Sequence, residues 1–229
     1  MMTDTQLDTL LKCSLFKNIS KQELLSLLPC LNATLQSFDE HQLIFNQGNV
    51  LNYVYIVIEG EIEIAKTNFA GQKNIISLLN CSQLFGEGVV STTKRLSPVS
   101  ATALSKAKLL LIPYERITIG CKNGCSFHFS LIHNMMNLLA EKNYHLNNKM
   151  DIILLKSMRE KLLSYLTFEA QRTNSKSFTL PFNRNQLADY LNVSRPSMCR
   201  ELARMKEEGL IDYYQNSFKL LDPSLFHNS

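Results

Sequence analysis

The 229-residue sequence predicts an α+β protein with a small antiparallel β-barrel or jelly roll first, a long helix second and a winged helix-turn-helix last. Three patterns favour this architecture. Short β-forming runs separated by glycines occupy residues 35–113. A long helical pattern covers residues 126–154, and two helical segments followed by a hairpin pattern cover residues 182–221. We therefore expect three parts, at residues 1–125, 126–154 and 155–229.

Two short helices are expected before the barrel, over residues 5–12 and 21–28, and Pro29 should end the second. The barrel region then shows a period of two, typical of strands. Its runs include Val54-Tyr55-Ile56-Val57-Ile58 and Leu109-Leu110-Leu111-Ile112, and the runs are separated by Gly48, Gly60, Gly71 and Gly86. About six to eight short strands at this spacing predict a small closed or two-layered antiparallel structure.

The helix at residues 126–154 should be about 44 Å long at 1.5 Å per residue. Apolar residues recur along it at heptad-like intervals, which favours pairing with a second copy of the same helix and hence a homodimer. The alternative is that this stripe packs only on the barrel. The stripe consists of Ile132, Met135, Leu139, Leu146 and Ile153.

The segment after Phe182 carries the punctuation of a helix-turn-helix. Asn183 and Ser194 are expected to cap the two helices, and Asn192 lies where the turn needs a left-handed residue. Pro196 suits the first turn of the second helix, and Gly209 suits its end.

The second helix of this motif should bury its apolar side and leave Arg195 and Arg200 exposed. Arginine pairs with guanine or phosphate, so two exposed arginines favour insertion into a DNA major groove. An ordinary helical hairpin with solvated arginines is the alternative. The residues 211–221 alternate around a polar turn, which favours a winged helix.

Composition limits the function classes. The net charge is +4, with most of the basic excess from Lys156 onward, beside the helix-turn-helix. The polar, acidic start is unlike a secretory signal, and no apolar stretch approaches the ~18 residues of a membrane span, so we expect a cytoplasmic protein without a membrane partner. Reduced cysteines are expected there. The motifs G-x-S-x-G, P-loop and H-E-x-x-H are absent, so no enzyme is expected. A nucleotide-binding signalling module without DNA binding stays open.

The whole arrangement resembles the CRP/FNR family of bacterial transcription regulators. Three stretches carry the likeness: IFNQGNVLNYVYIVIEGEIEI, LFGEG at residues 84–88 and NVSRPSMCRELARMKEEGLI. The resemblance implies a cyclic-nucleotide-binding-like β-barrel and a sequence-specific regulator. It also implies a homodimer on a pseudo-palindromic DNA site, with recognition helices about 34 Å apart. RNA polymerase is a further candidate partner.

Carried over by position, the family's DNA contacts fall on five residues of this chain. Pro196 stands where many members carry a glutamate that accepts a hydrogen bond from cytosine, so the preferred site should differ. The five expected contacts are Arg184, Ser194, Arg195, Ser197 and Arg200.

The sensing half departs from the cyclic AMP-binding members. Their Gly-Glu pair is present as Gly86 and Glu87, but their adjacent Arg and Ser or Thr fall within residues 97–100, which hold no arginine. A buried phosphate without its arginine is unfavourable. Arg95 is the nearest replacement. The adenine contact falls near Lys142 and Asn143, which do not reproduce it. Gly86, Glu87, Lys142 and Asn143 stay candidates for lining the pocket of another effector.

Two cysteine-based sites are not expected. Cys13 and Cys30 alone cannot supply the cysteine cluster with which the oxygen-sensing branch holds iron and sulfur. A second group lies at the start of the long helix, but its spacing is not a standard zinc pattern, and residues five apart on a helix face different sides. That group is Cys121, Cys125, His128 and His133.

Haem and redox chemistry remain alternatives. The family includes haem-dependent sensors of nitric oxide or carbon monoxide, and His133, Met135, Met136 and His145 are candidate haem ligands, although methionine at these spacings is more often core. Cys199 lies beside Arg200, which could lower its pKa and make it a redox switch. The alternative is that Cys199 is simply a small residue that fits.

Overall fold

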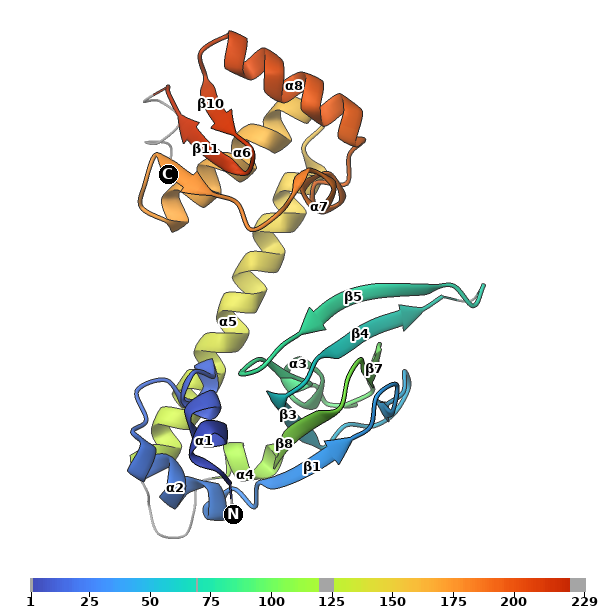
Figure 1. Ribbon diagram of the computed structural model, residues 1–229, viewed down its shortest axis with the longest axis vertical. Coiled ribbons are helices and arrows are strands. Elements are labelled where there is room, and N and C mark those ends of the chain that lie inside the picture. The colour runs from blue at the N-terminus through green and yellow to red at the C-terminus, as the bar shows by residue number, and fades with distance from the viewer. Residues whose placement is uncertain (1, 69, 120–125, 223–229) are drawn as a thin grey trace. The chain divides into compact units, whose positions relative to one another are not determined.

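The computed structural model describes residues 2–68, 70–119 and 126–222 (Figure 1). The chain forms two compact units, residues 1–141 and 142–229, and the boundary falls within one long helix. The division expected from the sequence, at residues 1–125, 126–154 and 155–229, stays a prediction.

The first unit begins with short helices whose ends are set by local hydrogen bonds. They are α1 (Asp4–Leu11), the 3₁₀ helix η1 (Ser14–Phe16) and α2 (Lys21–Cys30). Capping boxes at Thr3 and Ser20 satisfy the free N–H groups at the starts of α1 and α2. The sequence predicted that Pro29 ends the second helix, whereas α2 continues one residue further, to Cys30.

Two four-stranded antiparallel sheets follow, with strand orders β1-β8-β3-β6 and β2-β7-β4-β5. Their inner faces share one apolar core with the N-terminal helices. The two-layered antiparallel fold class predicted from the sequence is therefore confirmed. The elements are β1 (Thr34–Phe38), β2 (Leu43–Phe45), β3 (Tyr53–Glu59), β4 (Ile62–Thr67), β5 (Lys73–Leu79), β6 (Leu84–Phe85), α3 (Glu87–Val90), β7 (Ser100–Ala103), β8 (Ala107–Pro113) and α4 (Tyr114–Thr118).

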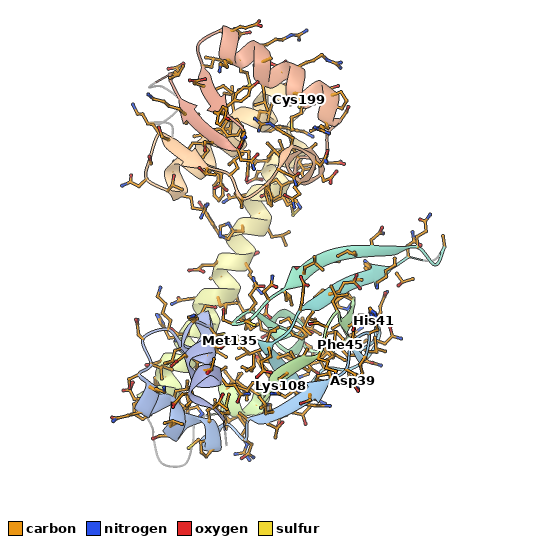
Figure 2. The ribbon with its side chains drawn as sticks, viewed as in Figure 1. Asp39, His41, Phe45, Lys108, Met135 and Cys199 are labelled. Carbon is orange, nitrogen blue, oxygen red and sulfur yellow. The ribbon has the colours of Figure 1, made fainter. Side chains whose placement is uncertain are left out.

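The long helix α5 (Ser126–Leu154) carries two apolar stripes. Leu131, Met135 and Leu138 are buried in the core of the first unit. Met135 is labelled in Figure 2. The expected place of Met135 in a self-pairing stripe is therefore wrong. The spacings of four and three residues from Leu131 to Met135 and Leu138 follow the core-facing side of the helix. A different set of large apolar residues is exposed: Phe129, Met136, Tyr144, Leu146, Met150 and Leu154.

The second unit contains the predicted winged helix-turn-helix. Three helices and the C-terminal end of α5, through Ile152, contribute to one apolar core, and β10 and β11 form the wing hairpin. A third strand, β9, pairs with β11 and was not expected from the sequence. The elements are α6 (Met158–Arg172), β9 (Ser177–Thr179), α7 (Arg184–Tyr190), α8 (Arg195–Glu207), β10 (Ile211–Tyr214) and β11 (Ser217–Leu220). Among the described residues, no helix has the length and apolar character needed to cross a membrane.

Candidate nucleic-acid interface and effector region

The ends of α7 and α8 largely follow the local sequence. Asn183 accepts a hydrogen bond from Gln186 N at 3.0 Å and so caps α7. Asn192 and Gly209 adopt the expected left-handed conformation, with φ of 52° and 75°. Ser194 precedes α8 as its N-cap residue, but its side chain makes no capping hydrogen bond. Ser194 therefore occupies the N-cap position without capping the helix through its side chain.

Helix α8 separates its apolar and basic sides. Met198, Leu202 and Met205 are almost fully buried in the core of the second unit. Arg195 and Arg200 are exposed, as the sequence predicts. The Arg200 guanidinium donates from Nη2 to Ser197 Oγ at 3.1 Å, so two of the expected DNA contacts lie side by side.

A polar hollow of about 380 Å³ lies beside the start of α8. It brings together side chains from the start of α7, the start of α8 and the turn of the wing. Arg184 and Arg195, which are 11 positions apart in sequence, share this hollow. Its lining residues are Asn183, Arg184, Asn185, Arg195, Gln215 and Asn216.

Arg184 connects α7 to the wing. Its Nη2 donates to the Gln215 carbonyl oxygen at 2.8 Å, and its guanidinium carbon lies 4.8 Å and 5.0 Å from the ring centroids of Phe218 and Tyr213. Burial lowers the pKa of Arg184 because a charged group loses hydration there. Arg184 thus has a structural role that the sequence did not indicate.

Cys199 is a free, half-buried cysteine on α8 (Figure 2). It packs against the core of the second unit. It is also close enough to Arg184 for a thiolate to interact with the guanidinium, which partly offsets the effect of burial on the Arg184 pKa. Its setting is compatible with both the structural and the redox interpretation.

A carboxylate pair holds α8 against α6. Arg159 donates from Nε to Glu201 at 2.6 Å and from both terminal nitrogens to Glu208 at 2.7 Å. This two-pronged pairing lowers the pKa of Glu208. The sequence does not indicate this network, because Arg159 and Glu208 lie 49 positions apart.

In the effector region, the polypeptide follows the Gly-Glu pattern of the cyclic AMP-binding members at residues 86 and 87. Gly86 has a φ of 85°, and a Cβ there would lie 3.0 Å from the Tyr55 ring, so glycine is required. Glu87 is buried at the start of α3. Glycine and glutamate therefore occupy the positions that the resemblance predicts.

The resemblance places the cyclic phosphate site at residues 97–100. In this segment Ser97 makes hydrogen bonds to backbone oxygens of the chain itself. Ser97 N donates to Asn49 O at 2.9 Å, and Ser97 Oγ donates to Val99 O at 2.7 Å. Pro98 has no N–H group. Arg95 lies 5.4 Å from the Tyr114 ring centroid and 3.7 Å from Glu115. Ser97 and Arg95 therefore already have partners within the protein.

The haem and metal candidates do not converge on one point. Met135 is buried in the core, whereas His133 and Met136 are exposed. His145 contacts the Phe168 ring edge-on at 5.9 Å. Lys142 and Asn143 are exposed on α5. Within residues 2–68, 70–119 and 126–222, no three His, Cys, Asp or Glu side chains group as a metal site. Cys121 and Cys125 lie outside the described residues.

Comparisons with known proteins agree with this architecture. A cyclic nucleotide-binding domain model matches residues 35–122, and a Crp-like helix-turn-helix domain model matches residues 160–227. The transcriptional activator protein FnrA of Stutzerimonas stutzeri is 22% identical over 187 residues, covering 79% of this chain and 74% of FnrA. The cyclic AMP receptor protein of Thermus thermophilus is 25% identical over 169 residues, covering 73% and 74%.

A solved structure extends the likeness to nearly the whole chain. A mutant of CooA from Carboxydothermus hydrogenoformans superposes with a TM-score of 0.57 at 16% identity, covering 99% of this chain and 96% of CooA. A two-sheet domain of the cyclic nucleotide-binding type, a long helix and a winged helix-turn-helix define a DNA-binding transcription regulator. The chain belongs to the CRP/FNR family.

Proposed function

We propose that this regulator acts as a homodimer that binds a pseudo-palindromic duplex site, with one recognition helix in each of two successive major grooves. The exposed Arg195 and Arg200, opposite the buried face of α8, carry this proposal. Their guanidiniums suit guanine edges and phosphates, and the hydroxyls of Ser194 and Ser197 suit phosphates. Pro196 offers neither a carboxylate nor an N–H group, so it cannot read cytosine as a glutamate would.

The polar hollow beside α8 is the proposed binding site for a DNA phosphate. Arg195 supplies charge, and the side-chain amides of Asn185 and Asn216 supply hydrogen-bond donors. Arg184 also faces this hollow while it holds the wing. Such contacts position the protein on DNA without specifying sequence.

The test is DNA affinity as a function of salt. A duplex selected from a random pool should bind the parent protein with an affinity that falls steeply as salt rises, because phosphate neutralisation releases counterions. Arg200→Ala should weaken binding and reduce the slope by about 1 if it contacts a phosphate. Lys66→Ala removes the same charge from an exposed position near the end of β4 and should leave the slope unchanged. Salt-independent binding, or none, would contradict the proposal.

We also propose that the effector is not cyclic AMP. The support is that Ser97 hydrogen-bonds to the backbone and Arg95 lies against the Tyr114 ring, while Pro98 has no N–H group. Titration calorimetry with cyclic AMP should give no binding heat, and DNA affinity should not respond to the nucleotide. Saturable binding would overturn this.

The haem alternative rests on the sequence, and a purified protein that shows no Soret shift with haem would exclude it.

The remaining proposals follow from the regulatory role. The protein acts in the cytoplasm, where the DNA is, and works through DNA binding without a catalytic activity of its own. RNA polymerase is its natural partner if binding changes transcription directly. A reporter gene controlled by the selected site tests that partnership and shows whether transcription rises or falls.

A further inference from the structure

One face of α5 has the pattern of a two-stranded coiled coil; it is exposed at its a positions and at Leu146, and half-buried at Ile132, Leu139 and Ile153. If Phe129 is assigned to heptad position a, every a and d position over four heptads is large and apolar except one. Phe129, Met136, Leu146 and Met150 have exposed fractions of 76%, 65%, 57% and 53%. The a positions are Phe129, Met136, Asn143 and Met150, and the d positions are Ile132, Leu139, Leu146 and Ile153.

Asn143 is the exception. It is exposed, and the neighbouring seam positions are Leu139 and Leu146. Residues at a meet the same position of the other strand in a parallel, in-register pair, so the two amides would face each other. Each amide has both a donor and an acceptor, so the pair can form a hydrogen bond. A shifted or antiparallel pair would instead bury an amide against apolar side chains.

The charges beside the seam favour the same orientation. Lys142 and Lys149 occupy g positions, and Ala140, Asn147 and Leu154 occupy e positions. In a parallel pair, g faces e of the other strand, so no lysine faces a lysine. In an antiparallel pair, the g positions of the two strands come together, and lysines would repel one another.

We infer that Asn143 pairs with Asn143 of a second copy and thereby fixes a parallel, in-register dimer of α5. This inference rests on the proposed homodimer and names the residue that selects its register. A slip of one heptad would displace one copy by about 10 Å along the helix. That is about a third of the half-site spacing of 34 Å, so a slipped dimer could not place both recognition helices correctly.

Cross-linking can measure the register directly in the full-length protein. A mixture of Leu139→Cys and Leu146→Cys chains is treated with a short bismaleimide, and linked peptides are identified by mass spectrometry. The parent background should give only 139–139 and 146–146 links. Asn143→Leu has a similar volume and no polar group. In that background the mixed 139–146 link should appear at a comparable yield, because a one-heptad slip no longer buries an amide.

Two further variants separate the causes. Asn137→Leu makes the same chemical change at an exposed position outside the seam and should keep the parent links. Asn143→Ala should give mixed links as Asn143→Leu does, and it serves if the leucine variant fails to fold. Light scattering reports the mass of every sample. A monomeric parent would overturn the proposed homodimer, whereas a dimer that keeps its register in both Asn143 variants would overturn this inference alone.

Discussion

At residue scale, Arg184 shows how one side chain can serve two neighbours. It lines the polar hollow, and it also donates to the Gln215 carbonyl oxygen and packs on two rings of the wing hairpin. The proposed role in DNA binding and the observed contacts with the wing therefore fall on one residue. Mutations at this position should separate the two effects.

Arg184→Met retains an apolar stem but removes the guanidinium. We expect the free energy of unfolding to fall by about 1 kcal/mol, because a hydrogen bond and two cation–π contacts are lost. Arg195→Met, at an exposed position, should change it by less than about 0.5 kcal/mol. Urea unfolding followed by circular dichroism measures both. An Arg184→Met protein as stable as the parent, but weak in DNA binding, would show that the wing contacts contribute little.

Cys199 provides a second test at residue scale. Oxidation of a thiol on α8 adds a polar group to the helix expected to enter the groove, so mild peroxide should lower DNA affinity by about tenfold or more if the thiol is a switch. Cys199→Ser should keep its affinity under the same treatment. Cys81→Ser removes an exposed cysteine from the first unit and should respond as the parent does. Equal sensitivity of the Cys199→Ser protein would leave Cys199 as a packing residue.

At the scale of elements, the position of α8 depends on charge as well as on its apolar side. Arg159 on α6 pairs with Glu208 at the end of α8, and this pairing holds the pKa of Glu208 below its ordinary value. A carboxyl group with a lowered pKa in the folded state stabilises the fold above its unfolded pKa. That stabilisation is lost as the pH falls through the folded value.

The stability difference between the parent and Glu208→Gln should therefore depend on pH. It should be present at pH 7, begin to shrink near pH 4 to 5, and vanish in stronger acid, where the parent carboxyl group is also protonated. Denaturant unfolding at a series of pH values measures this. Glu207→Gln changes the exposed neighbouring residue and supplies the control. A difference independent of pH would mean that the amide disturbs packing instead of the ion pair.

At the scale of the whole molecule, dimerisation and DNA binding should be coupled through two half-sites. Removing one half-site from the selected duplex should weaken binding by roughly 10²- to 10⁴-fold, because the second contact is otherwise intramolecular. Leu146→Asp places a charge in the proposed seam and should weaken binding to the full site while leaving binding to the half-site unchanged. Fluorescence anisotropy measures both. Equal affinity for full and half sites would indicate that one copy binds alone.

Short-range interactions explain which features could be predicted. Asn183, Asn192 and Gly209 act within a few residues of themselves, through a cap and two left-handed backbone angles, so their spacing identifies the helix-turn-helix. Gly86 and Glu87 likewise mark a local turn and the start of a short helix. By contrast, Met135 and Met136 are adjacent in sequence, and only packing shows that the first is in the core and the second is exposed.

The sequence alone is sufficient to predict the order of the structural elements and the helix that exposes Arg195 and Arg200, because these features depend on periodicity and local capping. The missing arginine of the cyclic phosphate site, within residues 97–100, follows instead from the resemblance to the CRP/FNR family. Tertiary structure decides which partners distant side chains have, such as Arg159 with Glu208 and Arg184 with the wing. These contacts join segments tens of residues apart, and their geometry exists only after the helices and strands have packed.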